Sequence, residues 1–182
     1  LTGSIHSDVN FNFSNGGSWE LDGISDIILF TTGSGIPNPI AVPYNQDPLT
    51  ISCWIKPNGN SEFIRWGNYG LAPLLIANVQ SDTTLRWYVN NAYRTATNSI
   101  TQNSWHNIVF SREAYNSDGK VYVNGVEVST QWTGGAPNSN NVPELKYSNY
   151  FIGNLGPLSV YTKKLSAAEV LQNYNALKGR FN

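Results

Sequence analysis

The chain has 182 residues, of which 40% are hydrophobic and 13% are charged, and its formal net charge is −1. This length and hydrophobic content are sufficient for the core of one β-sandwich domain. The near-zero charge, with no run of Lys or Arg, argues against nucleic-acid binding, and no apolar run reaches the length of a membrane span.

We interpret residues 1–182 as a single domain, and we expect residues 1–10 to be a tag or disordered. After them, short runs alternate apolar and polar residues between Gly, Pro, Asn and Asp, which is typical of an all-β sandwich. Strands are expected at Ser18–Leu21, Ile27–Thr31, Leu49–Lys56, Glu62–Trp66, Leu74–Val79, Thr84–Asn90, Ala92–Thr97, His106–Arg112, Gly119–Asn124, Gly125–Thr130, Tyr150–Ile152 and Leu158–Thr162. Thr32–Asp47 and Gln131–Lys146 are expected to be long loops.

The most regular alternation places Leu49, Ile51, Cys53 and Ile55 on one side of a strand. That side is expected to face the core. Cys53 is the single cysteine, so the chain can form no internal disulfide, and we interpret it as a small buried hydrophobic residue. Later in the chain, Asn124-Gly125 predicts a type I′ hairpin turn, because both of its positions need a positive φ.

A helix is predicted near the end of the chain. Ser166 is the expected N-cap, Glu169 completes a capping box, and Leu165 and Val170 are placed as a hydrophobic staple. The expected apolar stripe consists of Val170, Leu171, Tyr174 and Leu177. Gly179 is expected to end the helix.

The order of motifs in the second half of the chain resembles a known family. A Trp strand (Trp105–Phe110) precedes a Val-Asn-Gly hairpin (Lys120–Val128), an Ile-Gly strand (Tyr150–Gly153), a Tyr strand (Leu158–Tyr161) and the capped helix. Trp19–Asp26 also resembles the opening strand of that family. The chain resembles the laminin G-like branch of the concanavalin A-like lectin/glucanase superfamily. The resemblance implies a two-sheet antiparallel jelly roll that holds glycans or protein surfaces and is less often an enzyme.

The resemblance also suggests a metal site and a setting. Many family members bind Ca²⁺ near the opening Asp-Gly and near an acidic pair in the Tyr strand, so Asp22 and Asp26 are the candidate ligands here. Ser159 stands where that acidic pair is expected, and the alternative is that Asp22-Gly23 is only a turn. No other cofactor is expected. The ending Gln172–Phe181 is similar to the tails of such domains in structural proteins of large phages and giant viruses.

No catalytic constellation is predicted. A glycanase needs two carboxylates that flank the scissile bond, but Glu62 and Glu127 each stand alone in their strands. A polysaccharide lyase needs a Tyr or His base beside Arg, Gln or Asn. His106 follows Trp105, where the resembled family commonly has a histidine in a structural strand, and we interpret it as structural. A glycan-active hydrolase or lyase remains the alternative function.

Sugar binding requires exposed aromatic faces beside hydrogen-bonding groups. In Thr84–Arg94, alternation places Leu85, Trp87 and Val89 toward the core. The expected ligand-binding residues are Trp66, Arg86, Tyr88, Asn90, Tyr93 and Trp132, whereas the other four tryptophans (Trp19, Trp54, Trp87 and Trp105) are expected to pack between the sheets.

From these observations the sequence predicts a non-catalytic recognition or structural module. Its expected partner is a glycan, a host-surface protein or a virion protein, and its expected location is a virion or another extracellular surface. Nucleic acid and membrane insertion are not expected, and a homo-oligomer is left open.

Overall fold

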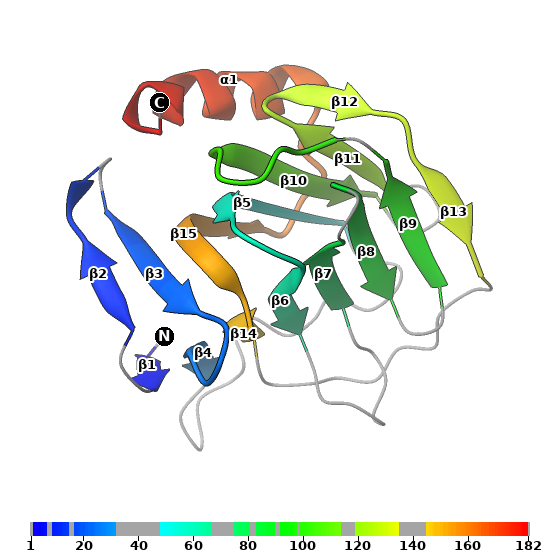
Figure 1. Ribbon diagram of the computed structural model, residues 1–182. Coiled ribbons are helices and arrows are strands. Elements are labelled where there is room, and N and C mark those ends of the chain that lie inside the picture. Colours follow the sequence, from blue (N-terminus) through cyan, green and yellow to red (C-terminus); the bar gives the residue numbers. More distant parts are fainter. Residues whose placement is uncertain are drawn as a thin grey trace.

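Two antiparallel sheets face each other, and one helix lies over the outside of the second sheet (Figure 1). The computed structural model describes residues 2–6, 9–14, 17–31, 48–66, 75–80, 83–89, 92–97, 99–113, 119–134 and 145–181. Within these ranges, the strand order of the first, eight-stranded sheet is β1 (Thr2–His6), β4 (Ile27–Thr31), β14 (Leu145–Asn149), β6 (Ser61–Trp66), β7 (Leu75–Val79), β8 (Leu85–Val89), β9 (Ala92–Ala96) and β13 (Gln131–Thr133).

The second sheet has seven strands among the described residues. Their order is β12 (Val126–Val128), β11 (Lys120–Val123), β10 (His106–Arg112), β5 (Leu49–Pro57), β15 (Ile152–Tyr161), β3 (Ser18–Asp22) and β2 (Asn10–Asn12). Helix α1 (Ala167–Leu177) follows β15, and a 3₁₀ turn (Lys178–Arg180) follows α1. None of the helices in these ranges is long and apolar enough to cross a membrane. This all-β architecture with one short C-terminal helix confirms the predicted fold class.

The core lies between the sheets. Leu49, Ile51, Cys53 and Ile55 are all fully buried, as the alternation predicts. Burial raises the pKa of the Cys53 thiol, as expected for an inert core residue. Across the sandwich, the Tyr147 hydroxyl donates to the carbonyls of Trp54 and Gly156 at 3.2 and 3.0 Å. These bonds join the two sheets at the middle of β15.

β15 joins two strands that were predicted separately. A bulge interrupts its pairing with β5 between Leu155 and Leu158, and Gly156 and Pro157 occupy that interruption. Proline is tolerated at a bulge because the local ladder is already disrupted. At the start of β15, Gly153 has φ +130°, and a Cβ there would lie 2.1 Å from the Lys56 carbonyl oxygen. Glycine is therefore required for the close approach of β15 to β5.

Four strands were not predicted. β1 and β2 lie wholly or partly within residues 1–10, which were expected to be a tag or disordered, yet Thr2–His6 pair with β4. β13 lies at the start of the stretch Gln131–Lys146, which was expected to be a loop, and β14 begins in the last two residues of that stretch. The other expected loop, residues 32–47, lies outside the described residues.

The capping box at the start of α1 is confirmed. The Glu169 backbone N–H donates to Ser166 Oγ at 3.3 Å, and the Ser166 N–H donates to Glu169 Oε2 at 2.8 Å. Leu165 and Val170 pack together in a small core on the outer side of the seven-stranded sheet. Leu171 was expected in the apolar stripe of the helix, but its side chain is 44% exposed and is not buried.

The predicted glycine stop of α1 is wrong. The helix passes into the 3₁₀ turn at Lys178, which keeps a right-handed conformation, and Gly179 lies inside that turn. Backbone hydrogen bonds of the tighter i→i+3 kind can satisfy the last carbonyl groups of a helix, so a glycine in the left-handed conformation is not needed there. The turn leads directly to the buried side chain of Phe181.

Trp54 is buried, but it does not pack between the sheets as expected. It neighbours Cys53 and Ile55, which face the core, so alternation places it on the outer side of β5. There its ring is stacked near Tyr174 and Phe181, with centroid separations of 5.7 and 4.4 Å. The C-terminal segment is therefore held to the seven-stranded sheet by an aromatic stack. Of the other tryptophans assigned to the core, Trp87 is buried there as predicted.

Candidate functional site

The outer face of the eight-stranded sheet carries three of the predicted ligand-binding residues. Leu85 and Trp87 of β8 are buried in the core, so Arg86 lies on the opposite face together with Tyr88. Antiparallel pairing places Tyr93 of β9 directly beside Tyr88, and Thr95 directly beside Arg86. Paired residues share a face, so all four side chains belong to the outer face.

Arg86, Tyr88 and Tyr93 form one contiguous tyrosine–arginine cluster. The Tyr88 and Tyr93 rings lie 5.2 Å apart between centroids and are tilted by 43°. The Arg86 guanidinium carbon lies 5.5 Å from the centre of the Tyr93 ring, and Arg86 Nη1 donates to the Tyr88 hydroxyl at 3.4 Å. All three side chains are half-buried. The two rings thus hold the guanidinium in a fixed position while part of each ring stays accessible.

A groove lined by hydroxyl groups adjoins this cluster. Its volume is about 370 Å³, and its walls come from the end of β9 and from the connection between β12 and β13. The lining residues are Thr95, Thr97, Ser99, Val128, Ser129 and Gln131. Thr95 links the two features, because it pairs with Arg86 on one side and with Gln131 on the other. The cluster and this hydroxyl groove therefore form one continuous surface. The groove was not predicted from the sequence.

Of the remaining predicted binding residues, Trp132 is not part of the cluster. Trp132 pairs with Arg94, which pairs with the core residue Trp87, so Trp132 lies on the other face at the edge of the sheet. The Arg94 guanidinium carbon lies 5.4 Å from a ring centre of Trp132. The backbone of Trp66 pairs with Leu75 and Leu145, but its side chain lies outside the described part of the structure, as does the whole of Asn90.

Asp22 and Asp26 shape the turn between β3 and β4. Asp26 Oδ2 accepts a hydrogen bond from the Asp22 backbone N–H at 2.8 Å, and Asp22 Oδ1 accepts one from the Ile24 N–H at 2.8 Å. Asp26 is buried, whereas Asp22 is exposed. Among the described residues, no three His, Cys, Asp or Glu side chains are grouped as metal ligands. The candidate calcium site stays untested, and both carboxylates accept backbone hydrogen bonds that shape the turn.

His106 has the environment of a structural histidine. It is buried, its Nε2 lies 2.9 Å from the Thr101 backbone nitrogen, and its Nδ1 lies 3.3 Å from Asn124 Nδ2. Burial lowers the pKa of its imidazole. Elsewhere, Glu62 forms an ion pair with Arg65, and Glu127 forms one with Lys120. Each of these acids is engaged with a nearby cation rather than with a second carboxylate.

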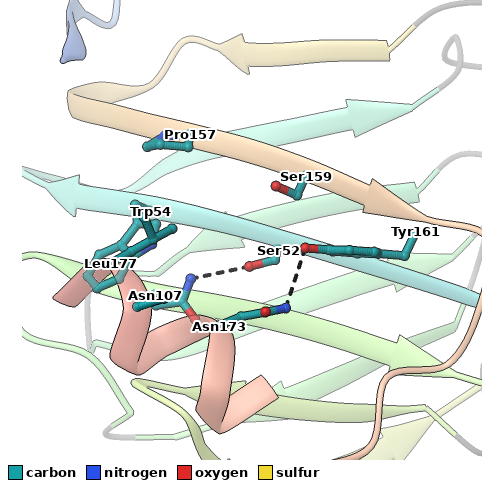
Figure 2. Close-up of a pocket in the computed structure, with 9 residues that line it drawn as sticks. Ser52, Trp54, Asn107, Pro157, Ser159, Tyr161, Asn173 and Leu177 are labelled. Carbon is teal, nitrogen blue, oxygen red and sulfur yellow. Dashed lines mark hydrogen bonds between the residues drawn. The ribbon is translucent and has the colours of Figure 1, made fainter. Parts of the chain in front are cut away.

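A second cavity lies between α1 and the outer face of the seven-stranded sheet (Figure 2). Ser52 and Trp54 of β5 and Asn107 of β10 line its floor, while Pro157, Ser159 and Tyr161 of β15 line one side. Asn173, Ala176 and Leu177 of α1 close the other side. We call this space the helix cavity. Local sequence patterns do not reveal the helix cavity, because its walls come from four elements that pack together only in the folded chain.

The family model for the concanavalin A-like lectin/glucanases superfamily (Laminin_G_3) matches residues 30–171. The chain belongs to this family. The match confirms the family inferred from the order of the motifs, whereas a search of curated proteins finds no match.

Solved structures of botulinum neurotoxin binding domains have a similar fold. The serotype G binding domain is 14% identical, with a TM-score of 0.71, and the match covers 96% of this chain and 46% of that one. A second structure is described with the statement that cell entry of botulinum neurotoxin type C is dependent upon interaction with two ganglioside molecules. It is 13% identical, with a TM-score of 0.71, and the match covers 97% of this chain and 46% of that one. The type DC binding domain in complex with SialylT is 12% identical, with a TM-score of 0.70 and coverages of 97% and 46%. The chain thus spans less than half of the length of these structures.

Proposed function

We propose that this chain is a non-catalytic glycan-recognition module that binds its ligand on the outer face of the eight-stranded sheet. The observation that carries the proposal is the continuity of the tyrosine–arginine cluster with the hydroxyl groove through Thr95. Helix α1 lies over the other sheet, and no described helix covers this face (Figure 1).

The chemistry of this surface suits a sugar chain. Tyrosine rings offer apolar faces to the C–H side of a pyranose, and the hydroxyls of Thr95, Thr97 and Ser99 exchange hydrogen bonds with sugar hydroxyls. The Arg86 guanidinium adds fixed donors beside the rings. An aromatic platform next to a row of neutral polar groups is therefore expected to bind an extended glycan, with one sugar on the rings and the next in the groove.

The similar toxin structures support this proposal only at the level of the fold. Two of their descriptions mention gangliosides or a sialylated ligand, but those chains are more than twice as long as the matched region. The identity of the sugar is therefore not transferred to this chain. A protein surface in place of a glycan is the nearest alternative ligand, because the same fold serves both purposes.

The setting that we propose is a virion or another extracellular surface. The support is compositional, since only 13% of the residues are charged and the polar surface must consist largely of Asn, Ser, Thr and Gly. The similarity of the C-terminal tail to phage and giant-virus structural proteins points the same way. A homo-oligomer would fit this setting, because repeated weak sites gain strength through multivalency.

A glycan array probed with the labelled protein tests the proposal. We expect binding to a defined group of glycans and loss of the signal in Tyr93→Ala, with Tyr150→Ala as a control because Tyr150 is 62% exposed outside the cluster. If the array is silent but a host-surface or virion protein is captured through the same face, the ligand is a protein. If both variants bind glycans as the wild type does, the outer face is not the site.

A second candidate function is a polysaccharide lyase, because the same face also carries a Tyr, an Arg and an Asn. Asn78 of β7 pairs with Arg86, and Arg86 contacts the Tyr88 hydroxyl. Such an enzyme uses a Tyr base beside groups that neutralise a uronate carboxylate. Release of unsaturated uronates from a polysaccharide panel, measured by ultraviolet absorbance and abolished in Tyr88→Phe, would establish this function instead.

A further inference from the structure

The helix cavity has a buried floor and a partly open rim. Trp54 and Asn107 are almost fully buried, whereas Ser159, Tyr161 and Asn173 at the rim are half-exposed. Figure 2 shows Trp54 and Tyr161 on opposite sides of Ser52, with Pro157 and Ser159 on β15 along one edge. The cavity is thus accessible from solvent between β15 and α1.

The floor contains a polar group whose hydrogen-bonding capacity is not used. Trp54 is only 3% exposed, and its Nε1–H has no hydrogen-bond partner among the described residues. Phe181 and Tyr174 stack near the ring, and Trp54 also lines the cavity, with its Nε1 covered by the surrounding walls. A buried N–H without an acceptor costs on the order of 1–3 kcal/mol. This cost makes the edge of Trp54 a favourable donor for a ligand acceptor.

The other polar groups of the cavity are neutral and are held in place. Asn107 Nδ2 donates to Ser52 Oγ at 3.3 Å and to the Cys53 carbonyl at 3.2 Å. Asn173 Nδ2 donates to the Tyr161 hydroxyl at 3.4 Å, and that hydroxyl can still donate its own proton. None of the described residues that line the cavity carries a charge. The lining therefore favours an uncharged ligand that carries a hydrogen-bond acceptor.

The volume of the helix cavity and its apolar wall further restrict which ligand can bind. The cavity volume is about 120 Å³, which corresponds to roughly four water molecules at about 30 Å³ each. Pro157, Ala176 and Leu177 supply apolar surface beside the donors. An acetamido group is planar and neutral, and its methyl, carbonyl and N–H groups together have about the size of this space. It also joins a methyl group to a carbonyl acceptor, as the lining requires.

We propose that the helix cavity binds the acetamido group of an N-acetylated amino sugar. The carbonyl accepts from the Tyr161 hydroxyl and, after a small adjustment of the cavity walls, from Trp54 Nε1–H. The methyl group packs against Leu177 and Ala176, and the sugar ring remains at the rim near Ser159. This site is separate from the tyrosine–arginine cluster, because it lies on the outer side of the other sheet.

Nuclear magnetic resonance titration with N-acetylglucosamine tests this proposal, with glucose as the matched sugar that lacks the acetamido group. The Trp54 indole N–H resonance, assigned with Trp54→Phe, is expected to shift with N-acetylglucosamine and not with glucose. Loss of a single hydrogen bond should weaken binding roughly three- to tenfold in Tyr161→Phe. Ala176→Leu should abolish binding by filling the cavity while it removes no hydrogen bond. Trp132→Phe, on β13 of the other sheet and outside the lining residues, should bind as the wild type does.

Several outcomes would overturn the proposal. Equal shifts with both sugars would mean that the acetamido group is not recognised, and no shift with either would mean that the cavity holds water only. Unchanged affinity in Ala176→Leu would place the ligand elsewhere. The test is also distinct from that of the proposed function, because Tyr93→Ala should leave the Trp54 response unchanged.

Discussion

Ile51 illustrates how a single position in this chain controls stability. It is fully buried in β5 between the two sheets, whereas Ile24 is 74% exposed in the turn after β3. Ile51→Ala should lower the free energy of unfolding by about 2–5 kcal/mol, because it removes buried methyl groups and leaves a cavity. Ile24→Ala, the matched control, should change it by less than about 0.5 kcal/mol. Urea denaturation measures both, and a near-neutral Ile51→Ala would mean that the strand register is wrong.

His106 should make stability depend on pH. Burial lowers the pKa of its imidazole below the ordinary 6.5, and the hydrogen bond to the Thr101 backbone opposes this effect only in part. The unfolded chain therefore takes up a proton at a higher pH than the folded chain does. Stability from this residue is complete above about pH 6.5 and falls as the pH drops toward the folded pKa.

The His106 prediction can be measured in two ways. The imidazole resonances should titrate with a midpoint below 6.5. In addition, His106→Gln should reduce the loss of unfolding free energy between about pH 7.5 and about pH 5. A midpoint at or above the ordinary value would contradict the structural environment described for this residue.

At the scale of an element, α1 depends on its N-terminal cap. Ser166→Ala removes the acceptor for the Glu169 N–H and should cost about 0.5–2 kcal/mol of unfolding free energy. Gln172→Ala, at an exposed position in the middle of α1, should be neutral or slightly stabilising because alanine has the higher helix propensity. Thermal unfolding of both variants distinguishes capping from propensity, and equal effects would show that the cap contributes nothing.

The turn between β3 and β4 provides the test of the calcium prediction. Both carboxylates of this turn accept backbone hydrogen bonds, so the turn can form without an ion. We expect the melting temperature to be the same with a chelator and with added Ca²⁺. A decrease with chelator that Ca²⁺ reverses would instead show that Asp22 and Asp26 hold the ion, because binding to the folded state stabilises it.

The elements also show what could be predicted from the sequence. Alternation identifies the central strands, whose buried sides are apolar, and the capping box identifies the start of α1. Alternation does not identify β2 or β13, because each is only three residues long and lies at the edge of a sheet. It also divides β15 at Gly156-Pro157, because these residues usually end a strand and only the tertiary bulge accommodates them.

The candidate site, like the fold, could be predicted from the sequence only in part. Alternation along β8 was enough to place Arg86 and Tyr88 on the outer face, but their contact with Tyr93 depends on the pairing register of β8 with β9. Trp132 was grouped with them because its strand was not recognised, and the register of β13 places it on the other face. The hydroxyl groove and the helix cavity both require packing between distant segments, which no local pattern reveals.

At the scale of the whole molecule, the two outer faces of the sandwich differ. Helix α1 lies over the seven-stranded sheet (Figure 1), where Tyr174 and Phe181 stack near Trp54. The tyrosine–arginine cluster and the hydroxyl groove lie on the outer side of the eight-stranded sheet. Within the described residues, no helix covers the outer face of the eight-stranded sheet, and this is why we propose that face for ligand recognition. The proposed glycan-binding surface is therefore a whole face of the molecule rather than a single residue.

Isothermal titration calorimetry with the best-bound glycan of the array tests this claim most directly. Wild type and Tyr150→Ala should bind with the same affinity, because Tyr150 lies outside the cluster. Tyr93→Ala removes a ring from the platform and should weaken binding by about tenfold or more, which corresponds to about 1.4 kcal/mol. Unchanged affinity in Tyr93→Ala, with the fold intact by circular dichroism, would contradict the assignment of the binding surface to the eight-stranded sheet.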